Sequence, residues 1–140
     1  MNKNEIIKNF TNVGNAILVG TKSFWEGVNV IGDALTLVII DKIPFPGPSI
    51  DCKADERFYT QILNMRSAFN VVSIPRAMID LYQGVGRLIR SETDKGAIIL
   101  CAPQLLEGSN KNYRKTFIDA FAHFTQTESL SEVKAFLQKI

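Results

Sequence analysis

The sequence predicts an α/β fold, a three-layer sandwich with a mostly parallel sheet. Three short, continuous apolar runs are typical of strands buried on both faces, and they lie at residues 16–20, 35–41 and 96–101. Segments with helical periodicity separate these runs, and strands that alternate with helices favour parallel pairing. Because three strands are few for this fold, we expect a chain that is truncated at its N-terminal side.

The N-terminal part is expected to contain a short helix and the first two strands. Residues 5–13 form the helix, and Ala16–Gly20 form a strand that leads into a polar and aromatic loop at 21–30. The second strand, at 35–41, ends on the carboxylate of Asp41. Ligands gather at the carboxyl ends of strands in open α/β sheets, so the loop after the first strand is a candidate site.

The rest of the chain alternates extended and helical segments. Three prolines make residues 43–49 a rigid extended loop that cannot be helical. A helix is predicted at 54–69, and after a link at 71–73 another runs from Pro75 to about Ser91. Two further helices follow the third strand. The apolar positions of the first of these four helices are Phe58, Ile62, Met65 and Phe69, and those of the last two are Tyr113, Phe117, Phe121 and Phe124, then Leu130, Val133, Leu137 and Ile140.

Composition excludes several classes of protein. The 140 residues are 46% apolar and 21% charged, which is typical of one globular domain, and a net charge of +2 does not select a partner. Two cysteines and one histidine are too few for a disulfide framework, a metal site or a histidine-based triad. No apolar run reaches the roughly 18–20 residues that span a bilayer, and the start lacks a signal-peptide pattern. We therefore expect a reduced, cytoplasmic protein with no membrane partner.

The stretch at 80–90 has a face that is built for a core. At 100° per residue, Leu81, Val85 and Leu88 fall within about 60° of one another on a helical wheel. We expect this stripe to pack inside the protein.

The opposite side of the same stretch suits an anion. Gln83, Arg87 and Arg90 share that side, and a guanidinium group forks onto oxygens such as those of a phosphate. Gly84 and Gly86 each cost a helix interior about 1 kcal/mol, which favours a close approach of another group to the backbone. The alternative is a surface helix with incidental arginines.

Two fragments resemble parts of a nucleotide-binding site but lack its geometry. Gly20-Thr21-Lys22-Ser23 has Thr21 where a Walker A loop needs lysine directly after its second glycine. Asp55 and Glu56 resemble a Walker B pair, yet they open a predicted helix, where acidic residues suit the helix dipole. Asp41 closes a strand but has no magnesium-bound triphosphate to serve. We therefore expect that this chain alone neither binds ATP tightly nor hydrolyses it.

The loop at 21–30 offers groups that suit a nucleic-acid backbone. Its hydroxyls suit phosphates and its two aromatic rings suit base stacking. For the rings, the alternative is packing in the core beside a tight turn at Gly27. Glu26 and Asn29 are polar in a mainly apolar setting, which favours a functional role. The candidate DNA-binding residues of this loop are Thr21, Lys22, Ser23, Phe24 and Trp25.

Three segments together resemble a known family. Residues 23–35 (SFWEGVNVIGDAL), 38–48 (VIIDKIPFPGP) and 81–100 (LYQGVGRLIRSETDKGAIIL) are similar to the C-terminal motor domain of DinG/XPD-type superfamily 2 DNA helicases. The first segment matches motif V of that family and the last matches motif VI, and the similarity runs from about Gly14 to Phe124. The resemblance implies the second RecA-like domain, of the P-loop NTPase type, in an ATP-dependent helicase that moves 5′→3′ on single-stranded DNA.

The resemblance also implies a role for each candidate residue. Arg87 and Arg90 would be the catalytic motif VI arginines, which reach ATP and Mg²⁺ held mainly by the first motor domain. Gln83 would link the nucleotide site to the DNA side, and Glu26 and Gly27 would lie at the interdomain cleft. The iron–sulfur cysteines of the family lie in its first domain, so we expect no cluster here. Further residues implied at the ATP cleft are Asn29, Gly84 and Gly86, and those implied near the DNA backbone are Thr21 and Ser23.

Two departures from the family pattern leave alternatives open. Asn29 stands where motif V usually has aspartate, and Ala102-Pro103-Gln104 stand where Asp-x-Arg usually follows the strand. If the usual aspartate and the Asp-x-Arg segment form an ion pair in the family, losing both members costs less stability than losing one. The two changes nevertheless favour a divergent or degenerate copy of the helicase domain.

The leading hypothesis is a single helicase domain spanning 1–140. Its partners would be single-stranded or forked DNA and an N-terminal motor domain, absent from this sequence, that carries Walker A and B motifs in cis or as a separate chain. The alternatives are a non-catalytic DNA-binding or interaction module derived from a degenerate helicase, and the regulatory motor part of a helicase-nuclease.

Overall fold

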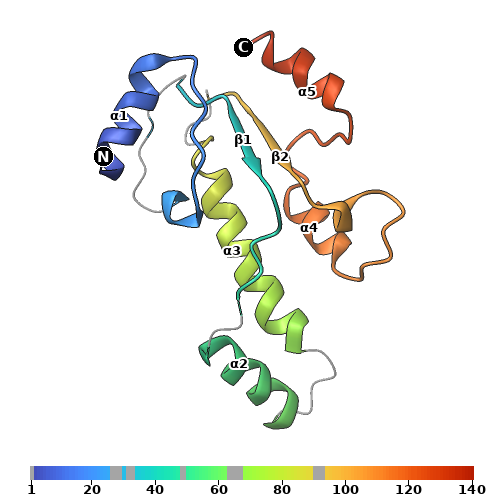
Figure 1. Ribbon diagram of the computed structural model, residues 1–140. Coiled ribbons are helices and arrows are strands. Elements are labelled where there is room, and N and C mark those ends of the chain that lie inside the picture. Colours follow the sequence, from blue (N-terminus) through green and yellow to red (C-terminus); the bar gives the residue numbers. More distant parts are fainter. Residues whose placement is uncertain (1, 26–29, 31–33, 48–49, 63–67, 90–93) are drawn as a thin grey trace. The chain divides into compact units, whose positions relative to one another are not determined.

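The computed structural model describes residues 2–25, 30, 34–47, 50–62, 68–89 and 94–140. The chain divides into two compact units. Unit 1 contains Met1–Ile39, Gln83–Ile99 and Ser129–Ile140, and unit 2 contains Ile40–Tyr82 and Leu100–Glu128. The described part combines helices with a small parallel sheet, so the predicted α/β class is confirmed at this level (Figure 1).

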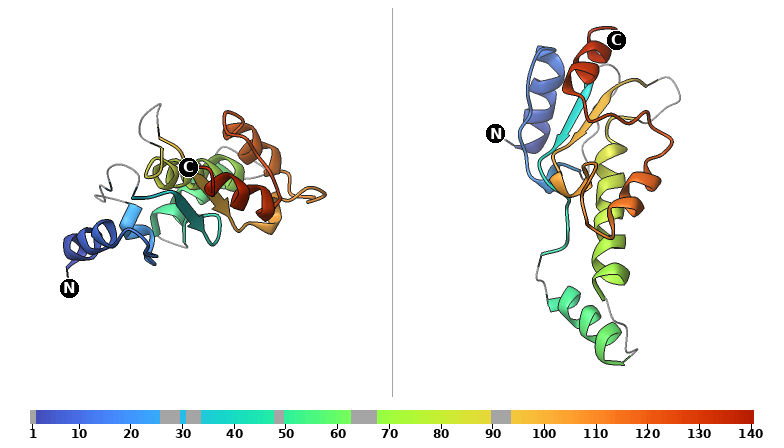
Figure 2. Two further views of the ribbon diagram at one scale, coloured as in Figure 1. Left: turned by 90° about the horizontal axis from the view of Figure 1, so that it is seen from above. Right: turned by 90° about the vertical axis from the view of Figure 1, so that its right-hand side faces the viewer.

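The sheet consists of two parallel strands, β1 (Leu37–Ile40) and β2 (Ala97–Leu100). The strands lie side by side in all three views of Figures 1 and 2. Both lie inside apolar runs that were predicted as strands, and Asp41 follows β1 directly as expected. Two hydrogen bonds frame the pairing, from the Ala97 N–H to the Thr36 carbonyl at 2.9 Å and from the Cys101 N–H to the Ile40 carbonyl at 2.8 Å.

The strand predicted at Ala16–Gly20 is wrong. These residues have no regular secondary structure, and Ile17 and Val19 are 92% and 88% exposed. A strand buried on both faces needs a neighbour on each side, and in the described part of the chain the sheet consists of β1 and β2 alone. The apolar run is therefore neither paired nor buried there.

α1 (Lys3–Val13) begins with a capping box that the periodicity did not reveal. The Glu5 N–H donates to Asn2 Oδ1, and the Asn2 N–H donates to Glu5 Oε2, both at 2.9 Å. This reciprocal pair satisfies donors that have no partner inside the helix. Gly14 follows the helix with a φ of 76°, a conformation that glycine adopts without steric cost. The predicted N-terminal helix is confirmed and begins earlier.

The helix predicted from residue 54 begins earlier and buries less than expected. α2 (Ile50–Arg57) continues into a π-helical turn at Phe58–Ile62. Of the apolar positions predicted for this helix, Phe58 is 50% exposed, Ile62 is 68% exposed and Phe69 is 37% exposed, so these three are not buried. Periodicity reports which side chains share a face, but it does not report whether another element covers that face. Met65 lies outside the described residues.

α3 (Ile74–Val85) grows directly out of a π-helical turn at Phe69–Ser73. The Ile74 N–H donates to the Phe69 carbonyl five residues back, so the link predicted at 71–73 is helical instead. Pro75 lies in the first turn of α3, as predicted.

Unit 2 has an aromatic core. The ring centroid of Phe45 lies 5.1 Å from that of Phe69, 5.7 Å from Tyr113 and 6.1 Å from Phe117. Phe117 is 1% exposed and is carried by α4 (Arg114–Ala120). Tilted and edge-on rings at such distances add to the free energy of burying their surface. This cluster holds the proline-rich loop after β1 against the helices of the unit.

The last two helices are shorter than predicted. α4 ends at Ala120, so Phe121 and Phe124 lie in the turn that follows it. α5 (Leu130–Leu137) begins after Ser129, whose hydroxyl accepts the Glu132 N–H. In the described segments of the chain, every helix is too short or too polar to cross a membrane.

Candidate functional site

The end of α3 carries the predicted phosphate-facing residues, but the helix is shorter than expected. α3 ends at Val85 and not near Ser91, because the chain tightens beyond it. The Arg87 N–H donates to the Gly84 carbonyl three residues back at 3.2 Å, and the Leu88 N–H donates to the Val85 carbonyl at 3.0 Å. Two glycines within three residues lower the helix propensity here, which accounts for the early end.

Of the two predicted faces, the apolar one is confirmed at this end of α3, and the other is described only at Gln83 and Arg87. Leu81, Val85 and Leu88 are 1%, 8% and 5% exposed, so the apolar stripe is buried as expected. Gln83 is exposed, and Arg87 is half-buried with its Nε atom inside the protein. The stripe therefore holds the segment in place, while an amide and a guanidinium lie at the boundary with solvent.

Leu88 fixes this turn against the residue that precedes β2. A Cβ atom on Gly96 would lie 2.6 Å from Leu88 Cδ1 and 2.8 Å from Leu88 Cγ, closer than carbon atoms tolerate. Glycine at position 96 thus leaves the room that the leucine side chain occupies. The position of Arg87 is set by packing of the very next residue on the start of a strand.

The candidate DNA-binding loop is held by α1. Lys3 Nζ donates to the Ser23 carbonyl at 2.6 Å and lies 5.4 Å from the centroid of the Phe24 ring, a cation–π distance. The Thr21 and Ser23 hydroxyls are hydrogen-bonded at 2.9 Å, and residues Lys22–Trp25 form a 3₁₀ turn. Sequence reasoning missed Lys3, because no local pattern signals a contact made twenty residues away.

Phe24 packs against the backbone of the same loop. A Cβ atom on Gly20 would lie 2.7 Å from Phe24 Cδ2, so the ring rests where only glycine leaves room. Phe24 is half-buried. This contact is typical of the packing alternative for Phe24.

The structure thus describes two groups of the predicted site residues. Thr21, Ser23 and Phe24 contact one another or Lys3, with Lys22 in the same turn. Gln83, Gly84, Gly86 and Arg87 follow one another along the end of α3. The remaining predictions, for Glu26, Gly27, Asn29, Arg90 and the side chain of Trp25, lie outside the described residues.

The acidic pair on α2 has a structural partner for each carboxylate. Arg76 forms an ion pair with Asp55, and the Ser73 hydroxyl donates to Glu56 Oε1 at 2.8 Å. Asp55 and Glu56 were expected in the first turn of a helix, where they would suit its dipole. Because α2 begins at Ile50, the pair lies beyond the first turn, and that expectation is wrong. These carboxylates connect α2 to α3 and to the turn before it.

The donors at the end of α3 fit phosphate oxygens better than a metal ion. Gln83 and Arg87 carry N–H groups, whereas Mg²⁺ prefers carboxylate, carbonyl and water oxygens. Among the residues that the structure describes, no group of three or more His, Cys, Asp or Glu side chains is placed to hold a metal ion. The chemistry of these residues therefore suits the oxygens of a phosphate group.

The chain is similar to known proteins along nearly its whole length. Residues 1–124 match the family model described as helicase C-terminal domain. The chain is 43% identical over 136 residues to the ATP-dependent DNA helicase YoaA of Haemophilus influenzae, covering 97% of the chain and 21% of that protein. It is 40% identical over 135 residues to YoaA of Escherichia coli, covering 96% and 21%. It is 35% identical over 134 residues to the 3′-5′ exonuclease DinG of Bacillus subtilis, covering 95% and 14%. The chain thus spans about a fifth of these relatives or less.

Proposed function

The chain belongs to the helicase C-terminal domain family, and we propose that it is the second motor domain of a DinG-type ATP-dependent DNA helicase. The relatives named ATP-dependent DNA helicases support this proposal, since two of them are 40% identical or more over almost the whole chain. The parallel pair of strands and the surrounding helices are compatible with a RecA-like three-layer sandwich. We propose that fold for the domain within the longer protein.

The observation that carries the mechanism is the position of Arg87. It follows α3 on a turn that is tightened at two glycines and braced by the buried Leu88. In phosphoryl transfer, an arginine supplied by a facing domain stabilises negative charge on the γ-phosphate, which is worth roughly 10³–10⁵ in rate. We assign this role to Arg87 and Arg90, and we assign Gln83 to the link between the nucleotide and the DNA side.

The nucleotide is proposed to bind mainly to another domain. When bound, ATP supplies the phosphoryl group whose hydrolysis drives the motor. A Walker A loop and a Walker B carboxylate are needed to hold its phosphates and Mg²⁺, and this sequence has neither. The part of the chain that would face ATP is the end of α3, together with Glu26, Gly27 and Asn29 from the loop.

The DNA side is proposed to be the loop held by Lys3. Thr21, Lys22 and Ser23 offer two hydroxyls and an ammonium group to the phosphates of single-stranded DNA. Since Phe24 packs on Gly20, we assign base stacking to the neighbouring Trp25 in preference to Phe24. Movement along the strand in the 5′→3′ direction is part of the proposal.

ATP turnover with and without single-stranded DNA tests the proposal. The 140-residue chain alone should not hydrolyse ATP. A longer protein that joins it to a domain with Walker A and B motifs, in cis or as a separate chain, should hydrolyse ATP faster when DNA is added. Turnover by the chain alone would contradict the division of the site. A longer protein whose turnover ignores DNA would contradict the helicase role.

A second candidate is a non-catalytic DNA-binding module derived from a helicase. The family pattern has Asp-x-Arg where this chain has Ala102-Pro103-Gln104. None of these three side chains carries a charge. Ala102 is 5% exposed, and Pro103 begins a 3₁₀ turn. A longer protein that binds single-stranded DNA but lacks ATP turnover would select this candidate. A third candidate is the motor part of a helicase-nuclease, which the relative named 3′-5′ exonuclease supports. The same assay tests it when DNA cleavage is measured as well.

A further inference from the structure

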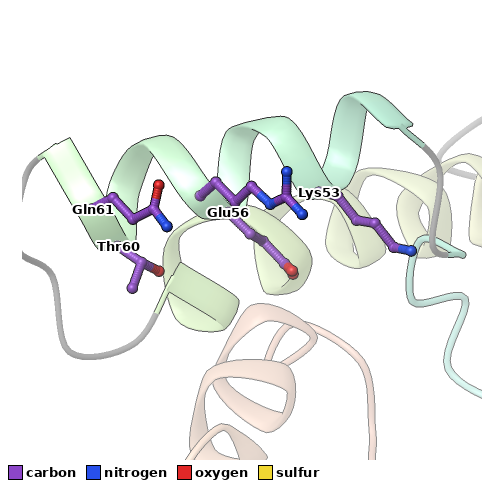
Figure 3. A pocket seen from close by; sticks show the side chains of 5 residues that line it. Lys53, Glu56, Thr60 and Gln61 are labelled. Atoms are coloured by element: carbon purple, nitrogen blue, oxygen red, sulfur yellow. The ribbon is translucent and has the colours of Figure 1, made fainter.

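One face of α2 and of the turn after it holds a shallow pocket that the proposed function does not use. Its volume is about 230 Å³, and it lies within unit 2. Figure 3 shows Lys53, Glu56, Thr60 and Gln61 on one side of the helical segment, which includes the π-helical turn after α2. The residues that line the pocket are Lys53, Glu56, Arg57, Thr60 and Gln61.

Two cations and one carboxylate line this pocket, namely Lys53, Arg57 and Glu56. Both carboxylates of the acidic pair are engaged, since Asp55 pairs with Arg76 and the Oε1 atom of Glu56 accepts the hydroxyl of the buried Ser73. Lys53 and Arg57 are exposed, and within the described residues no ion pair is recorded for either of them. The carboxylate of Glu56 lines the pocket together with the two cations, and its hydroxyl partner is neutral, so the formal charge of the lining is +1.

The spacing of the donors suits a linear polyanion. Lys53 and Arg57 are one helical turn apart, which places their Cβ atoms roughly 5–6 Å from each other. Thr60 and Gln61 continue the row along the π-helical turn with a hydroxyl and an amide. With the Glu56 carboxylate among them, these four donors are spread along the helical segment, which suits successive phosphates of a strand better than one compact ion.

We propose that this α2 face binds the phosphate backbone of single-stranded DNA, as a contact region additional to the loop at 21–25. The inference rests on the proposed function, because a helicase domain meets single-stranded DNA as its track. Lys53 and Arg57 neutralise two phosphates, and Thr60 and Gln61 donate hydrogen bonds to neighbouring phosphate oxygens. Contacts of this type do not depend on base sequence.

The test is binding of a short fluorescein-labelled oligothymidylate to the full 140-residue chain, followed by fluorescence anisotropy over a range of salt concentrations. The double variant Lys53→Gln/Arg57→Gln should lower the affinity about tenfold at low salt. It should also reduce the slope of log K against log salt by about 1.4, because each single-strand phosphate contributes about 0.7. The matched control Lys134→Gln/Lys139→Gln removes the same charge from α5 and the residues after it, and should bind like the unaltered chain.

The other outcomes overturn the inference in distinguishable ways. Unchanged affinity and slope in the α2 variant would refute the α2 contact and leave the proposed function intact. Equal losses in both double variants would assign the binding to net charge and refute it as well. No binding by the unaltered chain would also refute it, whereas ATP turnover decides the proposed function separately. The charge-conserving variant Lys53→Arg/Arg57→Lys should keep most of the affinity for the oligonucleotide. If its thermal melt is normal and its affinity is nevertheless lost, the proposed site is refuted.

Discussion

Two arginines of α3 and its C-terminal turn have contrasting surroundings. Arg76, in the first turn, forms an ion pair with Asp55 of α2, and both side chains are partly exposed, 40% and 48%. Arg87, after the last turn, is half-buried on a segment where Gly84 and Gly86 weaken the helix. The same residue type thus connects two helices at one end and is presented on a tightened turn at the other.

The difference teaches which property each arginine should control. A partly exposed ion pair contributes about 0.2–1 kcal/mol, so Arg76 is expected to affect stability modestly and ATP turnover hardly at all. The turn around Arg87 contains two residues that each cost a helix about 1 kcal/mol relative to alanine. Because α3 ends at Val85, the glycines stand at its end and not in its interior. The proposed place of Arg87 at the ATP site is the reason to expect that it affects ATP turnover far more than stability.

The largest effect on stability is expected at Leu88, whose packing holds the turn that carries Arg87. Leu88→Ala should lower the free energy of unfolding by roughly 2–5 kcal/mol, because Leu88 is 5% exposed and packs on Gly96. Urea denaturation of the 140-residue chain measures the effect. The control Leu130→Ala truncates a leucine that is 69% exposed and should change stability by no more than about 0.5 kcal/mol. Equal effects in the two variants would mean that Leu88 does not hold the turn.

A smaller effect is expected at the other arginine. Arg76→Ala should lower the free energy of unfolding by about 0.2–1 kcal/mol, since solvent screens its pair with Asp55. A double-mutant cycle with Asp55→Ala isolates the coupling energy between the two side chains. A coupling energy near zero would remove the structural role of Arg76. A value above about 2 kcal/mol would show a pair that is far less exposed than the structure describes.

Local patterns predicted the elements that depend on local sequence. β1 and β2 lie within the predicted apolar runs, and the stripe of Leu81, Val85 and Leu88 is buried as its spacing indicated. Periodicity could not predict the exposure of Ile17 or Phe58, because burial depends on whether another element lies against the residue. The early end of α3 could have been predicted from local sequence, because Gly84 and Gly86 lower the helix propensity there.

The sequence nominated the residue types of the candidate site, and their roles stay predictions, but it could not show how the parts are held. Gln83 and Arg87 were singled out from a shared face on a helical wheel, and in the structure Gln83 is exposed while Arg87 is half-buried with its Nε atom inside the protein. The contact of Lys3 with Ser23 joins residues twenty positions apart, and the packing of Leu88 on Gly96 joins a turn to a strand. Such contacts are set by the fold, so no local pattern reports them.

The most direct test of the central claim compares Arg87→Ala with Arg76→Ala in the longer protein that also contains a Walker A and B domain. DNA-stimulated ATP turnover is measured for both, and urea denaturation of the 140-residue chain is measured alongside. We predict that Arg87→Ala lowers turnover by roughly 10³-fold or more while stability changes by less than about 1 kcal/mol. Arg76→Ala should keep turnover near that of the unaltered protein. Near-normal turnover in the Arg87→Ala protein would contradict the assignment of this arginine to the ATP site.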